Sequence, residues 1–205
     1  MSHFTPKYNP WDELLCAVPG GDLYKAIYKG KADVVTDHID RFVDNGILLK
    51  SGKTLEADIV ITATGLKVVV LGKINVTMDG QPFDVTDKMS YRGVMFEGVP
   101  NAAMVFGYTN SSWTLKADLI ADYFCRLVQH MDKKGYDEVV PVNSDPSMAK
   151  KSFIDLSSGY IARVKDQLPK QGTKGAWKLH QNYFRDFLSL RLSSISAKEL
   201  QYGKK

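Results

Sequence analysis

The chain has 205 residues, and 44% of them are hydrophobic, which is typical of one compact globular domain or slightly more. The net charge of +4 comes from 27 basic and 23 acidic residues that are interspersed along the sequence. These values exclude a disordered chain and give no reason to expect a nucleic-acid-binding site. We interpret the basic stretch 165–205 as a solvated surface, and an RNA-binding role as an alternative that depends on charge alone.

The first predicted element is a short helix, Leu23–Lys29, with Asp22 as its N-cap and Gly30 as its stop. A β-meander follows. Strands are expected at 34–43 and 47–50, with a turn at Asp44-Asn45-Gly46 between them. A second turn at Ser51-Gly52-Lys53 precedes Thr54-Leu55-Glu56, which is expected to lead into the next strand. We expect the meander to lead into a parallel strand of a central sheet.

That parallel strand is predicted at Asp58–Gly65, where an apolar, β-branched run suits burial on both faces. It ends in the small residues Ala63, Thr64 and Gly65. Open α/β sheets bind ligands at the carboxyl ends of their strands, and small residues let the backbone approach a flat cofactor. The alternative is a central strand that happens to end in a glycine turn.

A second strand-to-turn unit is predicted further along the chain. After an irregular region to about Pro100, Asn101–Tyr108 reads as a buried strand, and the polar turn 109–112 follows it. A helix is expected over Trp113–Met131, with Ser111 or Ser112 as N-cap, because its apolar residues recur at steps of three and four. Free backbone N–H groups would point out of this turn. The two units together suggest a cofactor crevice.

The remainder is expected to be helical and peripheral. One amphipathic helix is predicted from Phe153 to Leu168, where Pro169 stops it, and another from Trp177 to Leu192.

Several familiar sites have no counterpart in the sequence. It contains no Gly-x-Gly-x-x-Gly fingerprint and no phosphate loop, so the chain alone should not hold a dinucleotide. It contains no Gly-x-Ser-x-Gly elbow, and the catalytic residues stay unknown. Asp37, His38 and Asp40 would alternate between the faces of a strand, so we expect them on the surface. Tyr8 and Trp11 could stack on a ligand, but packing in a core is commoner.

The cysteines and histidines predict no metal site. Cys16 and Cys125 lack metal-ligand spacing and lie in apolar sequence, so we expect buried, reduced thiols, and the four histidines are scattered singly. The first residues lack a signal-peptide pattern, and the longest apolar region is too short for a transmembrane segment. The expected location is cytoplasmic.

Six segments together are similar to one family. They are HFTPKYNPWD at 3–12, VTD at 35–37, DIVITATG at 58–65, GYTNSSWTLKADL at 107–119, and LPKQG at 168–172 with QNY at 181–183. On these segments the chain, from His3 to about Arg191, resembles the carboxyl-terminal part of a flavin-containing monooxygenase of the Baeyer–Villiger, ethionamide-activating type.

The resemblance implies an enzyme that binds FAD and NADPH, forms a flavin peroxide from O2, and inserts one oxygen atom into a small-molecule substrate at a ketone or a soft sulfur or nitrogen atom. It implies cofactor-binding roles for six residues. Thr64 and Gly65 would lie at the junction of two nucleotide domains, while Tyr108, Thr109, Asn110 and Ser111 would approach the flavin.

The implied fold is α/β, a partial FAD/NAD(P)-binding fold with a helical carboxyl-terminal extension. Residues 1–32 would end the NADP-binding domain, 33–132 would form the carboxyl-terminal half of the FAD-binding domain, and 133–205 would be the extension. The partner would be the amino-terminal half of the same enzyme, without which the chain should be inactive. Leu14 stands where Baeyer–Villiger members carry an arginine, so the cation that stabilises their oxyanion is missing. The alternative is a non-catalytic partner or relic of such a flavoprotein.

Overall fold

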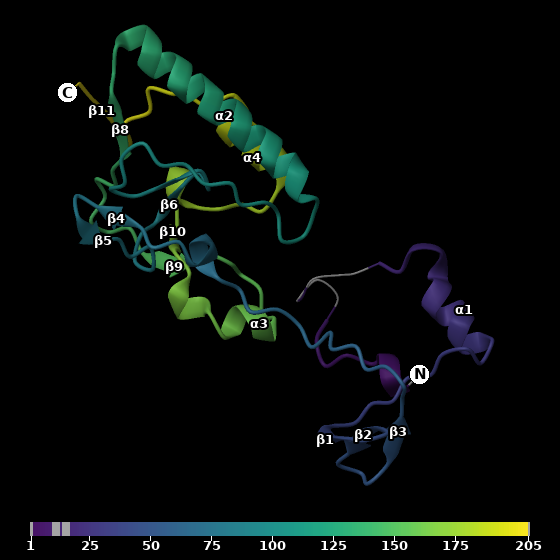
Figure 1. Cartoon of the computed structure of the whole chain (residues 1–205). Helices are drawn as coiled ribbons and strands as arrows, with labels where there is room; N and C mark the ends of the chain where they lie inside the picture. Colours follow the sequence, from purple (N-terminus) through teal and green to yellow (C-terminus); the bar gives the residue numbers. More distant parts are fainter. Residues whose placement is uncertain (1, 10–12, 14–16, 205) are drawn as a thin grey trace. The chain divides into compact units, whose positions relative to one another are not determined.

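The computed structural model describes residues 2–9, 13 and 17–204 of the chain. These residues belong to two compact units, Met1–Leu66 and Lys67–Lys205 (Figure 1). Among the described residues, no helix combines the length and apolar character needed to cross a bilayer.

In the Met1–Leu66 unit, the described residues form one short helix and one small sheet. Its elements are the 3-10 turns η1 (Ser2–Phe4) and η2 (Pro19–Gly21), helix α1 (Asp22–Tyr28), and strands β1 (Ile39–Val43), β2 (Gly46–Leu49) and β3 (Thr54–Glu56). The strands pair antiparallel in the order β1-β2-β3. Gly46 has to be a glycine, because a Cβ atom there would lie 2.0 Å from the carbonyl oxygen of Leu55.

The helix and the first hairpin predicted for this unit are confirmed, with shifted ends, whereas Thr54–Glu56, predicted as the lead into the next strand, forms a strand of its own. The helix begins at Asp22, so Asp22 is its first residue and not its N-cap, and the first strand begins only at Ile39. Asp37, His38 and Asp40 are exposed, as predicted. Tyr8 is 49% exposed, so the core packing expected of it is not observed, while Trp11 lies outside the described residues.

The predicted parallel strand at Asp58–Gly65 is wrong. No described residue pairs with this segment as a strand, and Ile59 and Ile61 are 79% and 84% exposed. A parallel strand needs neighbours that share its backbone hydrogen bonds and layers that cover both faces. The sheet of this unit is antiparallel and ends at β3, so it offers neither.

Residues 67–204, the described part of the Lys67–Lys205 unit, form three helices and four two-stranded sheets. Its helices are α2 (Trp113–Lys134), α3 (Gly159–Ala162) and α4 (Tyr183–Arg191), and its 3-10 turns are η3 (Val70–Lys73), η4 (Lys165–Gln167) and η5 (Gly175–Trp177). The antiparallel pairs are β4 (Thr77–Met78) with β5 (Gln81–Pro82), β6 (Ser90–Tyr91) with β7 (Met95–Phe96), β8 (Glu138–Pro141) with β11 (Leu200–Gly203), and β9 (Lys150–Ser152) with β10 (Lys170–Gly172).

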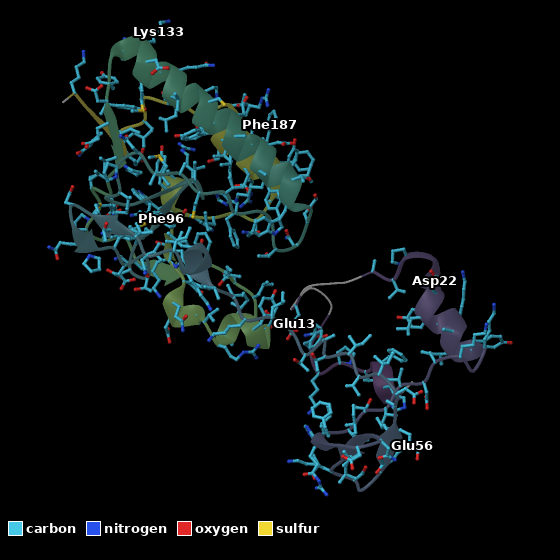
Figure 2. The ribbon with its side chains drawn as sticks, in the orientation of Figure 1. Glu13, Asp22, Glu56, Phe96, Lys133 and Phe187 are labelled. Atoms are coloured by element: carbon cyan, nitrogen blue, oxygen red, sulfur yellow. The ribbon has the colours of Figure 1, made fainter. Side chains whose placement is uncertain are left out.

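Helix α2 confirms the helix predicted over Trp113–Met131 and runs one turn further. It lies alongside α4 (Figure 1) and buries an apolar stripe at steps of three and four: Leu119, Ile120, Tyr123 and Leu127. Gly135 ends the helix in the left-handed region, at φ +64°. Lys133, drawn at this end in Figure 2, is one of two lysines that complement the negative end of the helix dipole.

Three hydrophobic clusters form the interior of this unit. The largest joins α2 to α4, β8 and β11, with Tyr91, Tyr123, Trp177, Leu190 and Leu200 among its members. A second surrounds α3 and η4 and contains Phe153, Ile154, Ile161, Val164, Leu168 and Leu179. A third, smaller cluster is formed by Val85, Phe96 and Val99.

Other predictions for this unit are corrected. Asn101–Tyr108 forms no strand: its one ladder contact is an isolated bridge between Ala103 and Met95, and Val105 is 57% exposed. The predicted helix Phe153–Leu168 reduces to α3 and η4, although the apolar positions that suggested it are largely buried. Residues 133–205 carry strands β8 to β11 as well as α3 and α4, so this part is mixed and not simply helical.

Cys125 also departs from its prediction. It lies on the outer face of α2 and is exposed, whereas a buried thiol was expected. Cys16 lies outside the described residues.

Candidate functional site

The loop that precedes α2 carries four of the predicted site residues, Tyr108 to Ser111. It starts at Gly107, where a Cβ atom would lie 2.3 Å from the Trp113 ring and 2.7 Å from the Trp113 Cα. Only glycine therefore allows Trp113 to fold back against the start of its own loop. The Trp113 ring also meets Phe106 edge-on, with 5.3 Å between the ring centroids. The loop is thus closed at its base by backbone and aromatic contacts.

The first turn of α2 faces this loop with an uncapped end. Ser112 holds the N-cap position in an extended conformation, as predicted, but its side chain makes no capping hydrogen bond. Its hydroxyl lies 2.8 Å from the hydroxyl of Thr114 instead. The first N–H groups of a helix lack partners within the helix and carry the positive end of its dipole. This end can therefore bind an oxygen atom or an anion.

Gln181 fastens the loop to the segment before α4. Its Oε1 atom accepts hydrogen bonds from the backbone N–H of Thr109 at 3.0 Å and from the Thr109 hydroxyl at 3.3 Å. The side-chain amide of Asn110 donates to the Gln181 backbone carbonyl at 3.3 Å. Gln181 itself has φ +47°, an uncommon conformation for a residue other than glycine. The region predicted to be peripheral therefore contacts the candidate site directly.

A buried ion pair lies beneath the loop. Lys116, in the first turns of α2, places Nζ 3.2 Å from Oδ2 of Asp186 on α4, and both side chains are almost fully buried. The same Nζ lies 5.2 Å from the ring centroid of Tyr108, within range of a cation–π contact. The loop thus rests on a charged pair that is shielded from water.

Tyr108 is 2% exposed, and its hydroxyl has no hydrogen-bonding partner among the described residues. Burial, and next to it the negative charge of Asp186, raises the pKa of this phenol far above its ordinary value. Tyr108 is therefore a neutral phenol held close to the Asp186 carboxylate.

His180 is a further titratable group that interacts electrostatically with Asp186 and Lys116. Burial lowers the pKa of its imidazole from the ordinary value, and its Nδ1 atom is buried without a partner among the described residues. The ring is accordingly neutral at pH 7 and next to Gln181 in sequence.

The remaining predicted site residues lie elsewhere. Thr64 and Gly65 belong to the Met1–Leu66 unit and are exposed, and Gly65 has φ +102° with no atom within 4 Å of a Cβ built on it. A side chain would be strained there by the backbone and not by its neighbours. Leu14, the position of the expected arginine, lies outside the described residues. The structure thus brings Tyr108, Thr109, Asn110 and Ser111 together on one loop.

Sequence reasoning missed Gln181, Lys116 and Asp186 as parts of this site. Gln181 and Lys116 lie within segments that carried the family resemblance, but nothing in those segments indicates which residue each one contacts. No sequence pattern indicated Asp186, because its partner Lys116 is 70 residues away in the sequence.

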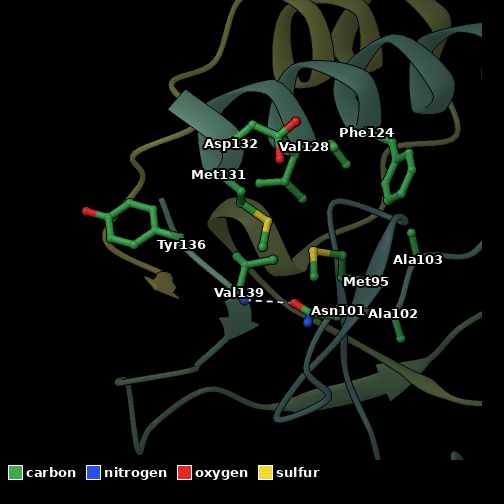
Figure 3. A pocket seen from close by; sticks show the side chains of 11 residues that line it. Met95, Asn101, Ala102, Ala103, Phe124, Val128, Met131, Asp132, Tyr136 and Val139 are labelled. Carbon is green, nitrogen blue, oxygen red and sulfur yellow. Dashed lines mark hydrogen bonds between the residues drawn. The ribbon is translucent and has the colours of Figure 1, made fainter. Parts of the chain in front are cut away.

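A small cavity of about 170 Å³ opens beside the second half of α2 (Figure 3). Its walls are mainly apolar and come from α2, the 95–103 segment and β8: Met95, Ala102, Ala103, Phe124, Leu127, Val128, Met131 and Val139. Asn101 is on its rim and accepts a hydrogen bond from the backbone N–H of Val139 at 2.9 Å. Within the described part of the chain, no group of three or more His, Cys, Asp or Glu side chains could hold a metal ion.

Known proteins are similar to this chain over its whole length. "Probable FAD-binding monooxygenase AlmA" of an Acinetobacter species is 52% identical over 207 residues, which is 100% of this chain and 41% of the relative. "FAD-containing monooxygenase EthA" is 48% identical in both Mycolicibacterium smegmatis, over 100% of this chain and 42% of the relative, and Mycobacterium tuberculosis strain H37Rv, over 99% and 42%.

No protein-family model matches the chain, and no solved structure matches it. The chain spans about 41% of the length of the first of these relatives. An identity near one half across the entire sequence nevertheless leaves no doubt about descent. By its sequence, this chain belongs to the family of flavin-containing monooxygenases, of which it spans one portion.

Proposed function

We propose that this chain is the carboxyl-terminal part of an FAD- and NADPH-dependent monooxygenase of Baeyer–Villiger type, which inserts one oxygen atom of O2 into a ketone or a soft sulfur or nitrogen atom. The observation that carries the proposal is the 52% identity to an FAD-binding monooxygenase over the full chain. When bound, the flavin supplies the redox and oxygen chemistry, and the protein supplies binding, orientation and electrostatics. Localisation in the cytoplasm is part of the same proposal.

The loop at 107–112 is proposed to contact one edge of a flavin. Thr109, Asn110 and Ser111 are small and polar, and the uncapped N–H groups of α2 can donate to a ring carbonyl or a ribityl hydroxyl. The Tyr108 side chain is buried beneath the loop beside Lys116. These residues would bind and orient the cofactor, and the aromatic pair Phe106 and Trp113 beside them would keep water away from it. Thr64 and Gly65 are proposed as further cofactor-binding residues.

Two apolar surfaces support a missing partner. The Asp58–Gly65 segment exposes Ile59 and Ile61, and α2 exposes a second apolar stripe that includes Phe124, at 42%, and Val128, at 38%. Exposed apolar patches of this kind mark surfaces that bury against other protein. We propose that the region of the relatives outside the matched 41% covers both surfaces and contributes the phosphate-binding fingerprints that this chain lacks.

Co-expression tests this proposal. The chain is produced alone and together with the region of the Acinetobacter relative that lies outside the match, and both preparations are purified and examined for flavin absorbance and NADPH oxidation. The chain alone should be colourless, and the complex should be yellow and should oxidise NADPH. A complex that forms without FAD or NADPH oxidation would support the alternative, a non-catalytic partner or relic, for which the neutral Leu14 is the specific argument. Stoichiometric FAD on the chain alone would contradict the need for a partner.

A further inference from the structure

We infer that Gln181 is a positioning residue, which holds the Thr109–Asn110 segment in the conformation that the cofactor loop needs. The inference rests on the proposed function in one respect, namely that this loop contacts the flavin. The hydrogen bonds from Thr109 and Asn110 to Gln181, called the clamp below, lie entirely within the Lys67–Lys205 unit.

The hydrogen bonds at Gln181 are concentrated on two loop residues. The side-chain carbonyl accepts from both donors of Thr109, its N–H at 3.0 Å and its hydroxyl at 3.3 Å, and the backbone carbonyl accepts from Asn110 at 3.3 Å. The partners are 71 and 72 residues apart in the sequence, so no local turn imposes this arrangement. One side chain therefore fixes both the backbone and the side-chain direction of Thr109.

The backbone of Gln181 shows that this arrangement is imposed by its surroundings. A glutamine at φ +47° is in the left-handed region, which costs free energy for a residue with a Cβ atom. Such a conformation persists when neighbouring contacts over-determine it, and it concentrates at functional sites. Asn182, the next residue, caps α4 by accepting from the N–H of Arg185 at 3.1 Å, which anchors the clamp on a helix end.

The loop is also supported by contacts beneath it that do not involve Gln181. Tyr108 is buried against Lys116, and Lys116 is paired with Asp186. Removal of the Gln181 side chain should therefore free Thr109, while the bond from Asn110 to the Gln181 backbone carbonyl, Tyr108 and the fold stay in place. This separation makes the clamp testable without unfolding the protein.

Hydrogen–deuterium exchange of the full chain measures the clamp directly, with the Thr109 amide as reporter. Gln181→Ala and Gln181→Gly both remove the acceptor, and Gln181→Gly also relieves the strained backbone. We expect the Thr109 amide to exchange about fivefold faster in both, the effect of losing one net hydrogen bond. Gln181→Glu keeps an acceptor oxygen and should restore the wild-type rate. Gln129→Ala, at an exposed position of α2, is the matched control and should leave the rate unchanged.

Unchanged exchange of Thr109 in both Gln181→Ala and Gln181→Gly would overturn the clamp. If one of these variants fails to fold, the other and Gln181→Glu still decide it, because their backbone requirements differ.

The link to the flavin is tested in the co-expressed complex with the Acinetobacter region. Gln181→Ala should raise the FAD dissociation constant about fivefold, and Gln181→Glu should return it to the wild-type value. Faster exchange without any change in FAD affinity would overturn the positioning role while the clamp stands. A wild-type complex that binds no FAD would instead refute the proposed function, and the exchange rates would still decide the clamp.

Discussion

The ammonium group of Lys116 lies 3.2 Å from the carboxylate of Asp186, and the two side chains are only 2% and 6% exposed. The pair links the first turns of α2 to α4 beneath the 107–112 loop. A buried charge that loses its partner is costly, whereas replacing both charges by apolar groups removes that cost.

We therefore expect Lys116→Met and Asp186→Asn each to lower the free energy of unfolding by about 3–5 kcal/mol. The double variant Lys116→Met/Asp186→Leu should be more stable than either single variant. Urea unfolding followed by circular dichroism gives all three values. Asp87→Asn, which removes the exposed partner of Lys150, is the control and should barely move the midpoint. If the loss of unfolding free energy in the double variant equalled the sum of the two single losses, the two charges would not depend on each other.

Gly107→Ala should destabilise the loop before α2. The new methyl group would meet Trp113 at 2.3–2.7 Å, including a backbone atom that cannot turn away. Overpacking of this kind costs about 1–3 kcal/mol. Thermal unfolding measures the loss, and Trp113 fluorescence should change with it. Gly203→Ala is the matched control, because its methyl group would meet Glu138 at an ordinary 3.6 Å. Equal melting temperatures for the two variants would contradict this account.

Asp145 should make stability depend on pH in the acid range. Its carboxylate accepts hydrogen bonds from Lys174 and from the hydroxyl and N–H of Ser147, which lower its pKa to about 2. Because the folded pKa is below the ordinary 3.8, this group stabilises the fold above about pH 4 and loses that contribution as the pH falls towards 2.

The measurement is the unfolding midpoint in urea between pH 2 and 5, for the wild type and for Asp145→Asn. The difference between the two should shrink as the pH falls through this window. If the difference between the two urea midpoints stayed constant with pH, the Asp145 carboxylate would not be the source of the pH dependence.

The second apolar stripe of α2 should make the isolated chain prone to association. Phe124 and Val128 are exposed beside the cavity of Figure 3, and replacing them with glutamine and threonine should reduce light scattering at a given concentration. Gln129→Ser on the same helix tests whether any surface change has this effect. In the co-expressed complex, thiol reagents should label Cys125, the neighbour of Phe124, more slowly than in the chain alone. Equal labelling rates would argue against coverage of this face.

Local patterns predicted the elements that depend on local interactions. Helix α2 and the β1–β2 hairpin were predicted correctly, because a stripe at helical spacing and an Asn-Gly turn act within a few residues. Asp58–Gly65 and Asn101–Tyr108 were not, because an apolar run becomes a strand only when a neighbouring strand completes its hydrogen bonds. Their composition indicates burial, but the described residues provide no such neighbours.

The candidate site was predicted in one respect and missed in another. The resemblance indicated the loop Tyr108–Ser111, and the structure shows these residues on one polar loop before an uncapped helix. The contacts that hold the loop in place could not be predicted from the sequence. Gln181 and Asp186 reach it from about 70 residues away, and no periodic pattern encodes a contact over that distance.

Strand β8 follows α2 closely in the chain, but its hydrogen-bonding partner is β11, at Leu200–Gly203. During synthesis, β8 therefore cannot form this pairing until those distant residues have left the ribosome. Through that interval the edge of β8 is open to strands from other molecules, and α2 lacks part of the cluster that buries its inner face. Chaperone dependence in the cell would be the natural result of this late pairing.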